Sequence, residues 1–131
     1  MIAIDSSALV CLLLQEPAAL AISQSLGRAS MRFLSAANWL ETAIVIEAKR
    51  GSVGALELDA LVDLAAIEIV PVTAEIARAA RIAYRYYGKG RHPAALNFGD
   101  CFAYGLAKTK GLPLLAVGGD FAKTDLDLAL T

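Results

Sequence analysis

The sequence is poor in the residues that build zinc and disulfide sites. Of its 131 residues, one is histidine (His92) and two are cysteines (Cys11 and Cys101). A single histidine excludes a site built from several histidines, and the cysteines are too far apart for a C-x-x-C pair. Each cysteine lies in an apolar helical run, so we expect two buried free thiols in a reducing compartment.

The sequence also lacks a strong charge of either sign. Its 12 lysines and arginines nearly balance 13 aspartates and glutamates, and the net charge of −1 does not indicate a strongly basic nucleic-acid binder. A balanced total can still hide an acidic pocket beside a basic rim. No apolar run is long enough to span a membrane and no signal peptide is recognisable, so we expect a cytoplasmic protein without membrane contact.

Apolar residues are abundant. They make up 57% of the chain, against 19% charged residues, which excludes a disordered protein. A chain of this length predicts one domain, residues 1–131, with a substantial core. The apolar excess also indicates a surface that a partner covers.

Short apolar runs alternate with helical patterns along the chain. Strands are expected at 1–5, 32–36, 67–72 and 113–117, with an added edge strand at 126–128. Helices are expected at 8–14, 17–26, 38–50, 52–64, 73–87 and 97–110. Ser6 or Ser7 could cap the first helix, Pro17 should be the first residue of the second, and Gly51 should end the third. This alternation predicts an α/β fold with a central parallel sheet of four to five strands.

Four carboxylates stand at comparable junctions between strands and helices. Asp5 and Asp120 follow strands, while Glu41 and Asp100 lie near the first turns of helices. Each one alone could simply cap a helix or compensate its dipole. Together at one edge of a sheet, they could stay ionised only around a cation. Mg²⁺ prefers oxygen ligands and promotes phosphodiester hydrolysis, so the set favours metal-assisted hydrolysis.

A basic stretch follows the third expected strand. Arg78, Arg81 and Arg85 share one helix face, and Lys89 and Arg91 follow in the loop 88–93. Tyrosines at 84, 86 and 87 interleave with these cations, as on surfaces that bind single-stranded nucleic acid. The five cations are candidate RNA contacts. A solvated helix face, core packing and partner contact are the alternatives.

Four segments resemble PIN-domain ribonucleases, specifically the VapC toxins of bacterial toxin–antitoxin pairs. They are residues 4–9 (IDSSAL), 38–42 (NWLET), 96–104 (LNFGDCFAY) and 118–125 (GGDFAKTD). The third segment is highly specific, and the resemblance extends over essentially the whole chain. It implies a PIN-like three-layer α/β/α fold.

The resemblance also assigns roles to single residues by position. The family's acidic quartet, which is catalytic and binds the metal, falls on Asp5, Glu41, Asp100 and Asp120. The supporting polar positions fall on Ser6 or Ser7, Asn97, Thr124 and Asp125.

The family further implies an activity and partners. We expect Mg²⁺- or Mn²⁺-dependent endonucleolytic cleavage of RNA, often tRNA or ribosomal RNA. We also expect a homodimer and inhibition by a cognate VapB-type antitoxin, whose C-terminal segment crosses the toxin. Two positions depart from the family pattern: Val117 stands where relatives often carry lysine, and Gly119 where they often carry a polar or acidic residue.

Other classes of protein also place carboxylates at the edge of a sheet. A phosphatase of the D-x-D type would need a second aspartate at Ser7. A phospho-receiver domain would need an acidic pair at the first strand and lysine at Val117. The remaining alternative is a catalytically silent PIN-like module that binds RNA or a partner. Loss of a quartet member would favour that module, and all four are present.

Overall fold

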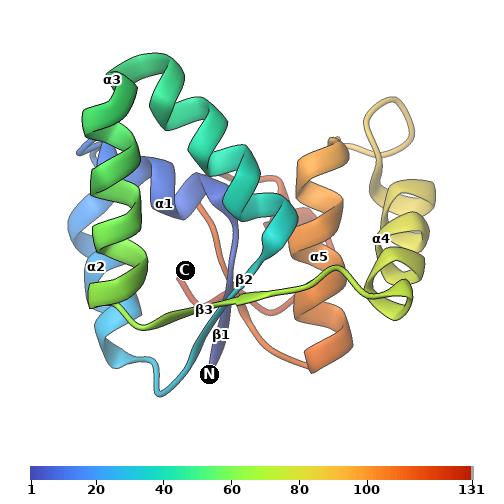
Figure 1. The fold of residues 1–131 in the computed structure, drawn as a ribbon. Helices are drawn as coiled ribbons and strands as arrows, with labels where there is room; N and C mark the ends of the chain where they lie inside the picture. Colours follow the sequence, from blue (N-terminus) through green and yellow to red (C-terminus); the bar gives the residue numbers. More distant parts are fainter. Residues whose placement is uncertain (131) are drawn as a thin grey trace.

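A computed structural model describes residues 1–130 and has a central parallel sheet (Figure 1). Its strands are β1 (Ile2–Ile4), β2 (Arg32–Ser35), β3 (Ile67–Val70) and β4 (Leu114–Leu115), in the order β3-β2-β1-β4. All three strand pairs are parallel, which confirms the predicted sheet. The edge strand expected at 126–128 is a single parallel bridge between Leu114 and Leu128.

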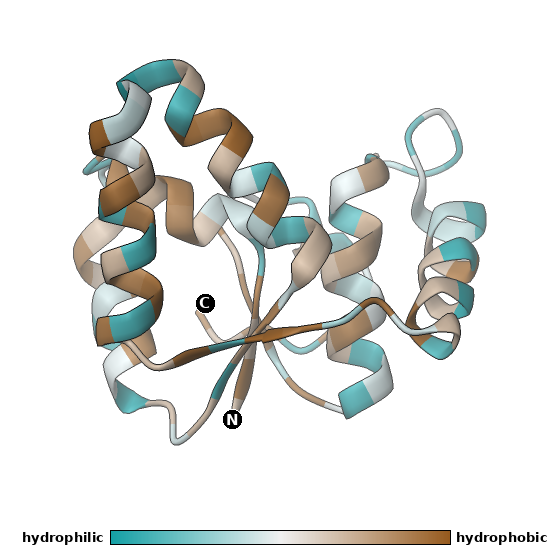
Figure 2. Cartoon of the chain, in the orientation of Figure 1, coloured by the Kyte–Doolittle hydropathy of each residue, from teal (hydrophilic) through white to brown (hydrophobic). Residues whose placement is uncertain are grey.

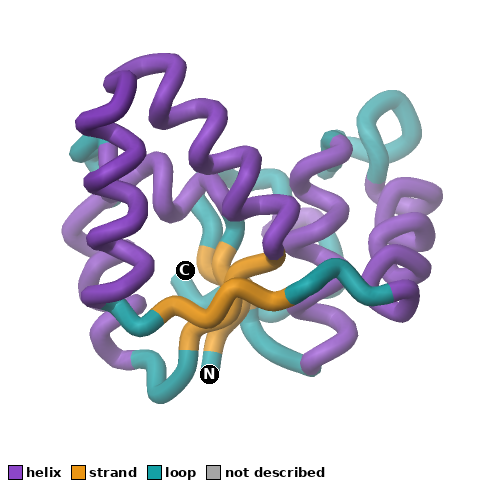
Figure 3. Tube along the Cα trace, in the orientation of Figure 1, coloured by secondary structure: helices purple, strands orange, loops and turns teal. Residues whose placement is uncertain are grey.

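Helices cover both faces of this sheet. They are α1 (Ser6–Leu13), α2 (Ala19–Arg28), α3 (Ala36–Leu64), α4 (Ala74–Tyr87) and α5 (Phe98–Lys110), followed by the short 3₁₀ helix η1 (Phe121–Lys123). Figure 3 shows the strands gathered at the centre, with α1, α2 and α3 on one side and α4 and α5 on the other. The three-layer α/β/α architecture is confirmed.

Each face of the sheet has its own apolar core. Ala3 and Phe33 point into the core beneath α4 and α5, whereas Ile4 and Leu34 point into the core beneath α1, α2 and α3. This alternation is the two-residue period of a strand. In Figure 2 the strands are mostly brown, and the loop between α4 and α5 is mostly teal or pale.

Both cysteines are free and buried, as predicted. Cys11 belongs to the core beneath α1, α2 and α3, and Cys101 to the core beneath α4 and α5. Of the helices within residues 1–130, none combines the length and apolar character that crossing a bilayer requires.

Side-chain caps fix where the helices near the sheet edge begin. Asp5 caps α1, because its Oδ2 accepts a hydrogen bond from Ser7 N at 3.0 Å, and Ser35 caps α3. A capping box opens α5: Asn97 Oδ1 accepts from Asp100 N at 2.9 Å, and Asp100 Oδ2 accepts from Asn97 N at 3.0 Å. Local hydrogen bonds therefore orient Asp5 and Asp100.

The first two helices differ from the sequence prediction: α1 begins at Ser6, and α2 runs to Arg28, past Gly27. The cap of α1 is Asp5 itself rather than Ser6 or Ser7. The second helix begins at Ala19 instead of Pro17, because Glu16 and Pro17 form a turn in which Ala19 N donates to Glu16 O at 2.9 Å.

The helices predicted at 38–50 and 52–64 are one kinked helix, α3. Gly51 has φ 60° and ψ −146°, a conformation that glycine adopts readily. It therefore bends the helix where we expected it to end, and Figure 1 shows the bend at the top of α3.

The strand order places Asp5 at a switch point of the sheet. The chain passes outward from β1 to β2 and β3, and then returns to β4 on the other side of β1. Ligands of open parallel sheets bind at such reversals, beyond the carboxyl ends of the strands. Asp5 directly follows β1, and α3 begins directly after β2.

Candidate functional site

Asp5 lies at the carboxyl end of β1 and is 2% exposed. Its backbone N donates to Leu115 O of β4 at 2.9 Å, which fixes it between two strands. One carboxylate oxygen, Oδ2, caps α1, while Oδ1 is buried without a hydrogen-bond partner. Burial raises the pKa of Asp5 to about 6, the bonds from Ser7 lower it, and Asp100 and Glu41 add to the rise. A buried carboxylate oxygen without a donor fits a cation ligand.

Donors from two helices hold Glu41, which lies in the second turn of α3 and is half-buried. Ser6 Oγ donates to Glu41 Oε1 at 2.5 Å, and Asn38 Nδ2 donates to the same oxygen at 3.2 Å. The other oxygen, Oε2, lies against Gly99 so closely that a Cβ on Gly99 would approach it to 2.2 Å. The glycine therefore leaves room for the carboxylate at the start of α5.

Asn38 is a residue of this site to which the sequence analysis gave no role. It is 0% exposed, and its Nδ2 also donates to Gly99 O at 3.0 Å, which ties α3 to the first turn of α5. Because Nδ2 faces two acceptors, Oδ1 is turned away from them, and it is buried without a partner. The available signal was its spacing, three residues before Glu41 on one helix face.

Asp100 joins the cluster from the first turn of α5. Burial raises its pKa, the backbone N–H of Asn97 lowers it, and the charges of Glu41 and Asp120 raise it. Asp120 is exposed and precedes η1. The structure thus brings Asp5, Glu41 and Asp100 together at one sheet edge, and it places Asp120 within electrostatic range of Asp100.

In the described residues, the acidic side chains do not form a complete set of metal ligands. Within residues 1–130, no three side chains of aspartate, glutamate, histidine or cysteine are grouped as a preformed metal site would be. Asp5, Glu41 and Asp100 each give one oxygen to a donor of the protein, and their charges repel one another. A cation would offset that repulsion. The donor set of carboxylate oxygens suits a hard divalent ion.

The remaining supporting positions have structural contacts. Ser7 Oγ accepts from Val117 N at 3.0 Å and so ties the end of β4 to α1. Thr124 Oγ1 donates to Phe121 O at 2.6 Å, which closes the turn after η1. These hydroxyl groups hold the segments that carry Asp5 and Asp120.

Asp125 pairs with α5 instead of the carboxylate cluster. It accepts from Tyr104 OH and from Lys108 Nζ, each at 2.6 Å, and the hydrogen bond from Lys108 holds the pKa of Asp125 below its usual range. Tyr104 and Lys108 lie one and two turns beyond Asp100 along α5. Asp125 therefore fastens the C-terminal segment to that helix.

The two departures from the family pattern have different structural settings. The half-buried Val117 packs against the core beneath α1, α2 and α3, so its side chain offers no phosphate contact. A Cβ at Gly119 would meet nothing within 4 Å, and its φ does not require glycine. The backbone therefore leaves room for a polar side chain at 119, and this sequence does not use it.

The candidate RNA contacts lie on the other side of α5 from Glu41. Arg78, Arg81 and Arg85 are exposed on α4, as the spacing predicted. Arg81 and Lys89 line a groove between α4 and α5. The Arg91 guanidinium lies 5.7 Å from the centroid of the Tyr84 ring.

The metal-free protein should become more stable when Asp5 is replaced by asparagine. Asparagine can still cap α1, and it removes a buried charge. Since burial raises the pKa of Asp5 from 3.8 to about 6, the carboxylate makes folding less favourable as pH rises from about 4 to 6, by up to about 3 kcal/mol. Chelated wild type should lose stability over this range more steeply than Asp5→Asn.

Thermal unfolding between pH 4 and 8 in the presence of a chelator measures this difference. Asp59→Asn, at an exposed position of α3, is the matched control and should follow wild type. A clear loss of stability in Asp5→Asn would mean that the buried charge of Asp5 stabilises the metal-free fold instead of opposing it.

In sequence, the chain is similar to members of a single protein family. The family model of the PIN domain matches residues 2–126. VapC ribonuclease Mb0640 of Mycobacterium bovis is 53% identical over 123 residues, which cover 94% of each chain. Ribonuclease VapC of Mycolicibacterium smegmatis is 50% identical over 123 residues, covering 94% of this chain and 95% of the relative.

A solved structure with the same fold is that of Mycobacterium tuberculosis VapC20, described as a sarcin-ricin loop cleaving toxin. It aligns with a TM-score of 0.78 at 17% identity, over 96% of each chain. VapBC2 of Rickettsia felis, bound to a DNA fragment from its promoter, aligns with a TM-score of 0.77 at 14% identity, over 98% of this chain and 97% of that one. At these identities the likeness concerns the fold alone.

Proposed function

The chain belongs to the PIN-domain family, and we propose on that premise that it is a VapC-type endoribonuclease dependent on a divalent metal. The observation that carries the proposal is the meeting of Asp5, Glu41 and Asp100 at the switch point of the sheet, with Asp5 Oδ1 buried and unpartnered. We propose that residues 1–131 act as a single domain.

Asp5, Glu41 and Asp100 would hold Mg²⁺ or Mn²⁺, with Asp120 at the exposed side. When bound, such an ion neutralises charge on the scissile phosphate and makes water a better nucleophile. The protein fixes the ligands beforehand: β4 and α1 orient Asp5, Ser6 and Asn38 orient Glu41, and the capping box orients Asp100. Such supporting contacts set both metal affinity and activity in metal sites.

The substrate class we propose is structured RNA, such as tRNA or ribosomal RNA. The exposed cations of α4 and the following loop supply the phosphate contacts that such a substrate needs. They are Arg78, Arg81, Arg85, Lys89 and Arg91.

We propose two protein partners: a second copy of the chain and a VapB-type antitoxin. The second half of α3 exposes Val53, Leu56 and Leu64, of which Leu64 is 88% exposed. Apolar side chains gathered in this way are typical of protein contacts.

A catalytically silent PIN-like module is the alternative function. Such a module would gain nothing from three crowded carboxylates, one of them buried with a raised pKa, since the crowding lowers stability. All four acids are present, which supports hydrolysis over binding alone.

Metal binding should be visible without any RNA. Mn²⁺ at 100 times its dissociation constant should stabilise the fold by about 2.7 kcal/mol and raise the unfolding temperature by on the order of 10 °C. Asp5→Asn should reduce the shift, whereas the control Asp59→Asn should keep it. If Mn²⁺ leaves the unfolding temperature of wild type unchanged, that result would argue against a metal site.

A further inference from the structure

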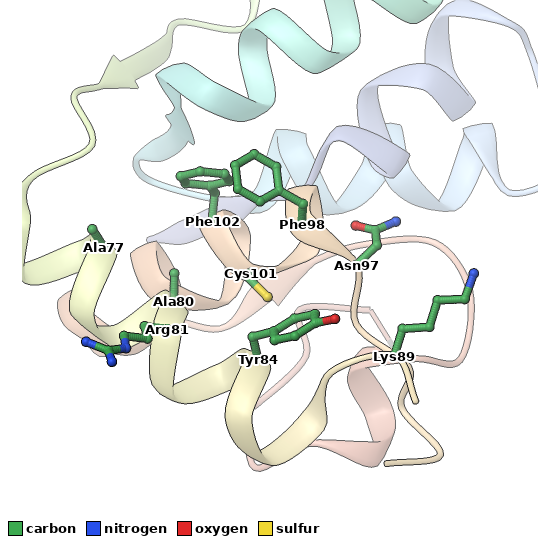
Figure 4. A pocket seen from close by; sticks show the side chains of 9 residues that line it. All are labelled: Ala77, Ala80, Arg81, Tyr84, Lys89, Asn97, Phe98, Cys101 and Phe102. Carbon is green, nitrogen blue, oxygen red and sulfur yellow. The ribbon is translucent and has the colours of Figure 1, made fainter. Parts of the chain in front are cut away.

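A groove with an apolar floor lies between α4 and α5 (Figure 4). Its volume is about 570 Å³, and Ala77, Ala80 and Cys101 form much of its floor. Asn97 lines the groove and also caps the helix turn that carries Asp100. The groove therefore begins where the carboxylate cluster ends.

Aromatic side chains form the walls of this groove. Phe98 and Phe102 of α5 and Tyr84 of α4 line it. In Figure 4 the two phenylalanine rings point away from Tyr84, and both also line a second hollow that contains Glu41. Phe98 is 78% exposed and Tyr84 is 40% exposed. The Phe98 and Phe102 rings pack edge to face, with centroids 4.8 Å apart and planes at 85°. This packing supports Phe98 from one side and leaves most of its surface open to a ligand.

The charged side chains that line the groove are cations. Arg81 and Lys89 stand at opposite ends of it in Figure 4, with Tyr84 between them. Among its described lining residues there is no aspartate or glutamate. Arg91 adds a third cation near the rim, next to the Tyr84 ring. The groove thus combines an apolar floor, aromatic faces and positive ends.

We propose that the α4–α5 groove seats an unpaired nucleotide of the RNA substrate. Its base lies against Phe98 and Tyr84, and the flanking phosphates lie at Arg81 and Lys89. Aromatic faces with nearby cations are how proteins hold single-stranded RNA. The inference rests on the proposed ribonuclease function, because a strand whose phosphodiester lies at Asp100 continues past Asn97 into the groove. An antitoxin segment would find the same floor, but the cationic ends and the position beside the carboxylates favour RNA.

Binding of a fluorescein-labelled single-stranded oligouridylate, measured by anisotropy in chelator, tests the groove. Phe98→Ala should weaken binding about tenfold, the order expected for one lost stacking contact. Arg81→Gln should weaken it several-fold and flatten its salt dependence. The matched controls are Leu20→Ala and Arg28→Gln, exposed positions on α2 beyond the opposite face of the sheet, and both should bind like wild type.

RNA cleavage measured in parallel distinguishes failure of the groove proposal from failure of the proposed ribonuclease function. Phe98→Ala should raise KM for RNA and leave kcat close to wild type. If wild type cleaves RNA and Phe98→Ala binds and cleaves RNA as well as wild type does, the groove does not bind RNA. The proposed ribonuclease function is then unaffected. If Phe98→Ala instead releases a co-expressed antitoxin or changes the oligomeric state, with RNA binding intact, the groove holds protein. Wild type that neither binds nor cleaves RNA overturns both proposals.

Discussion

Asp100→Asn should reduce metal-stimulated RNA cleavage by about 100-fold or more, while the metal-free protein keeps or gains stability. Asparagine has the size of aspartate, and its amide oxygen can still accept the hydrogen bond from Asn97 N that closes the capping box. The change therefore removes the negative charge of a proposed metal ligand and little else. Because burial and the charges of Glu41 and Asp120 raise the pKa of Asp100, its loss relieves repulsion in the cluster.

Cleavage assays and melting curves on the same preparations separate loss of chemistry from loss of fold. Asp59→Asn removes the same charge from an exposed site on α3 and should cleave like wild type. Undiminished cleavage by a folded Asp100→Asn would remove Asp100 from the catalytic set. The Mn²⁺-induced rise in unfolding temperature should shrink in this variant, which provides a readout that does not depend on RNA.

Gly99→Ala should reduce cleavage by about 10–100-fold without destabilising the protein. A Cβ at this position would stand 2.2 Å from Glu41 Oε2 and 2.7 Å from Cδ, so the carboxylate must move. That group is the end of a flexible side chain, and the fold can accommodate its displacement. Alanine also favours a helix over glycine, by up to about 1 kcal/mol. Stability and activity should therefore change independently.

A glycine elsewhere in the chain provides the matched control. Gly27 lies in α2, and a Cβ there would meet nothing within 4 Å, so Gly27→Ala should keep full activity. Adding Glu41→Asp to Gly99→Ala shortens the displaced side chain. The two losses should then be clearly non-additive, as for residues in contact. Strict additivity, or full activity of Gly99→Ala, would show that the position of Glu41 does not limit the reaction.

Features held by hydrogen bonds between residues close in sequence can be predicted from local sequence patterns. The spacing of Asn97 and Asp100 is that of a capping box, and the structure forms it. Buried parallel strands appear in a sequence as continuous apolar segments. The runs before Asp5 and after residue 31 fit this pattern, and the structure pairs them as neighbouring parallel strands. The strand end at Asp5 and the helix start at Asp100 are therefore predictable from local signals, whereas the meeting of Asp5, Glu41 and Asp100 rests on the family resemblance.

Contacts between distant segments could not be read from the sequence. The bond from Asn38 to Gly99 spans 61 residues, and no local pattern marks an asparagine as the link between two helices. The family pattern marks Asp125 as a supporting polar position, and no local signal shows that its donors are Tyr104 and Lys108 on α5. Gly51 was expected to end a helix, because a glycine that bends a helix and one that stops it look the same in sequence.

The most direct test of metal-dependent RNA hydrolysis is cleavage of a structured RNA in chelator, followed by re-addition of Mn²⁺. Chelator should stop cleavage, and Mn²⁺ should restore it for wild type but not for Asp100→Asn prepared in parallel. The new ends should be 5′-phosphates, because water attacks in line and the 2′-hydroxyl takes no part. Cleavage that persists in chelator, or products that end in 2′,3′-cyclic phosphates, would contradict a carboxylate-bound metal at Asp5, Glu41 and Asp100.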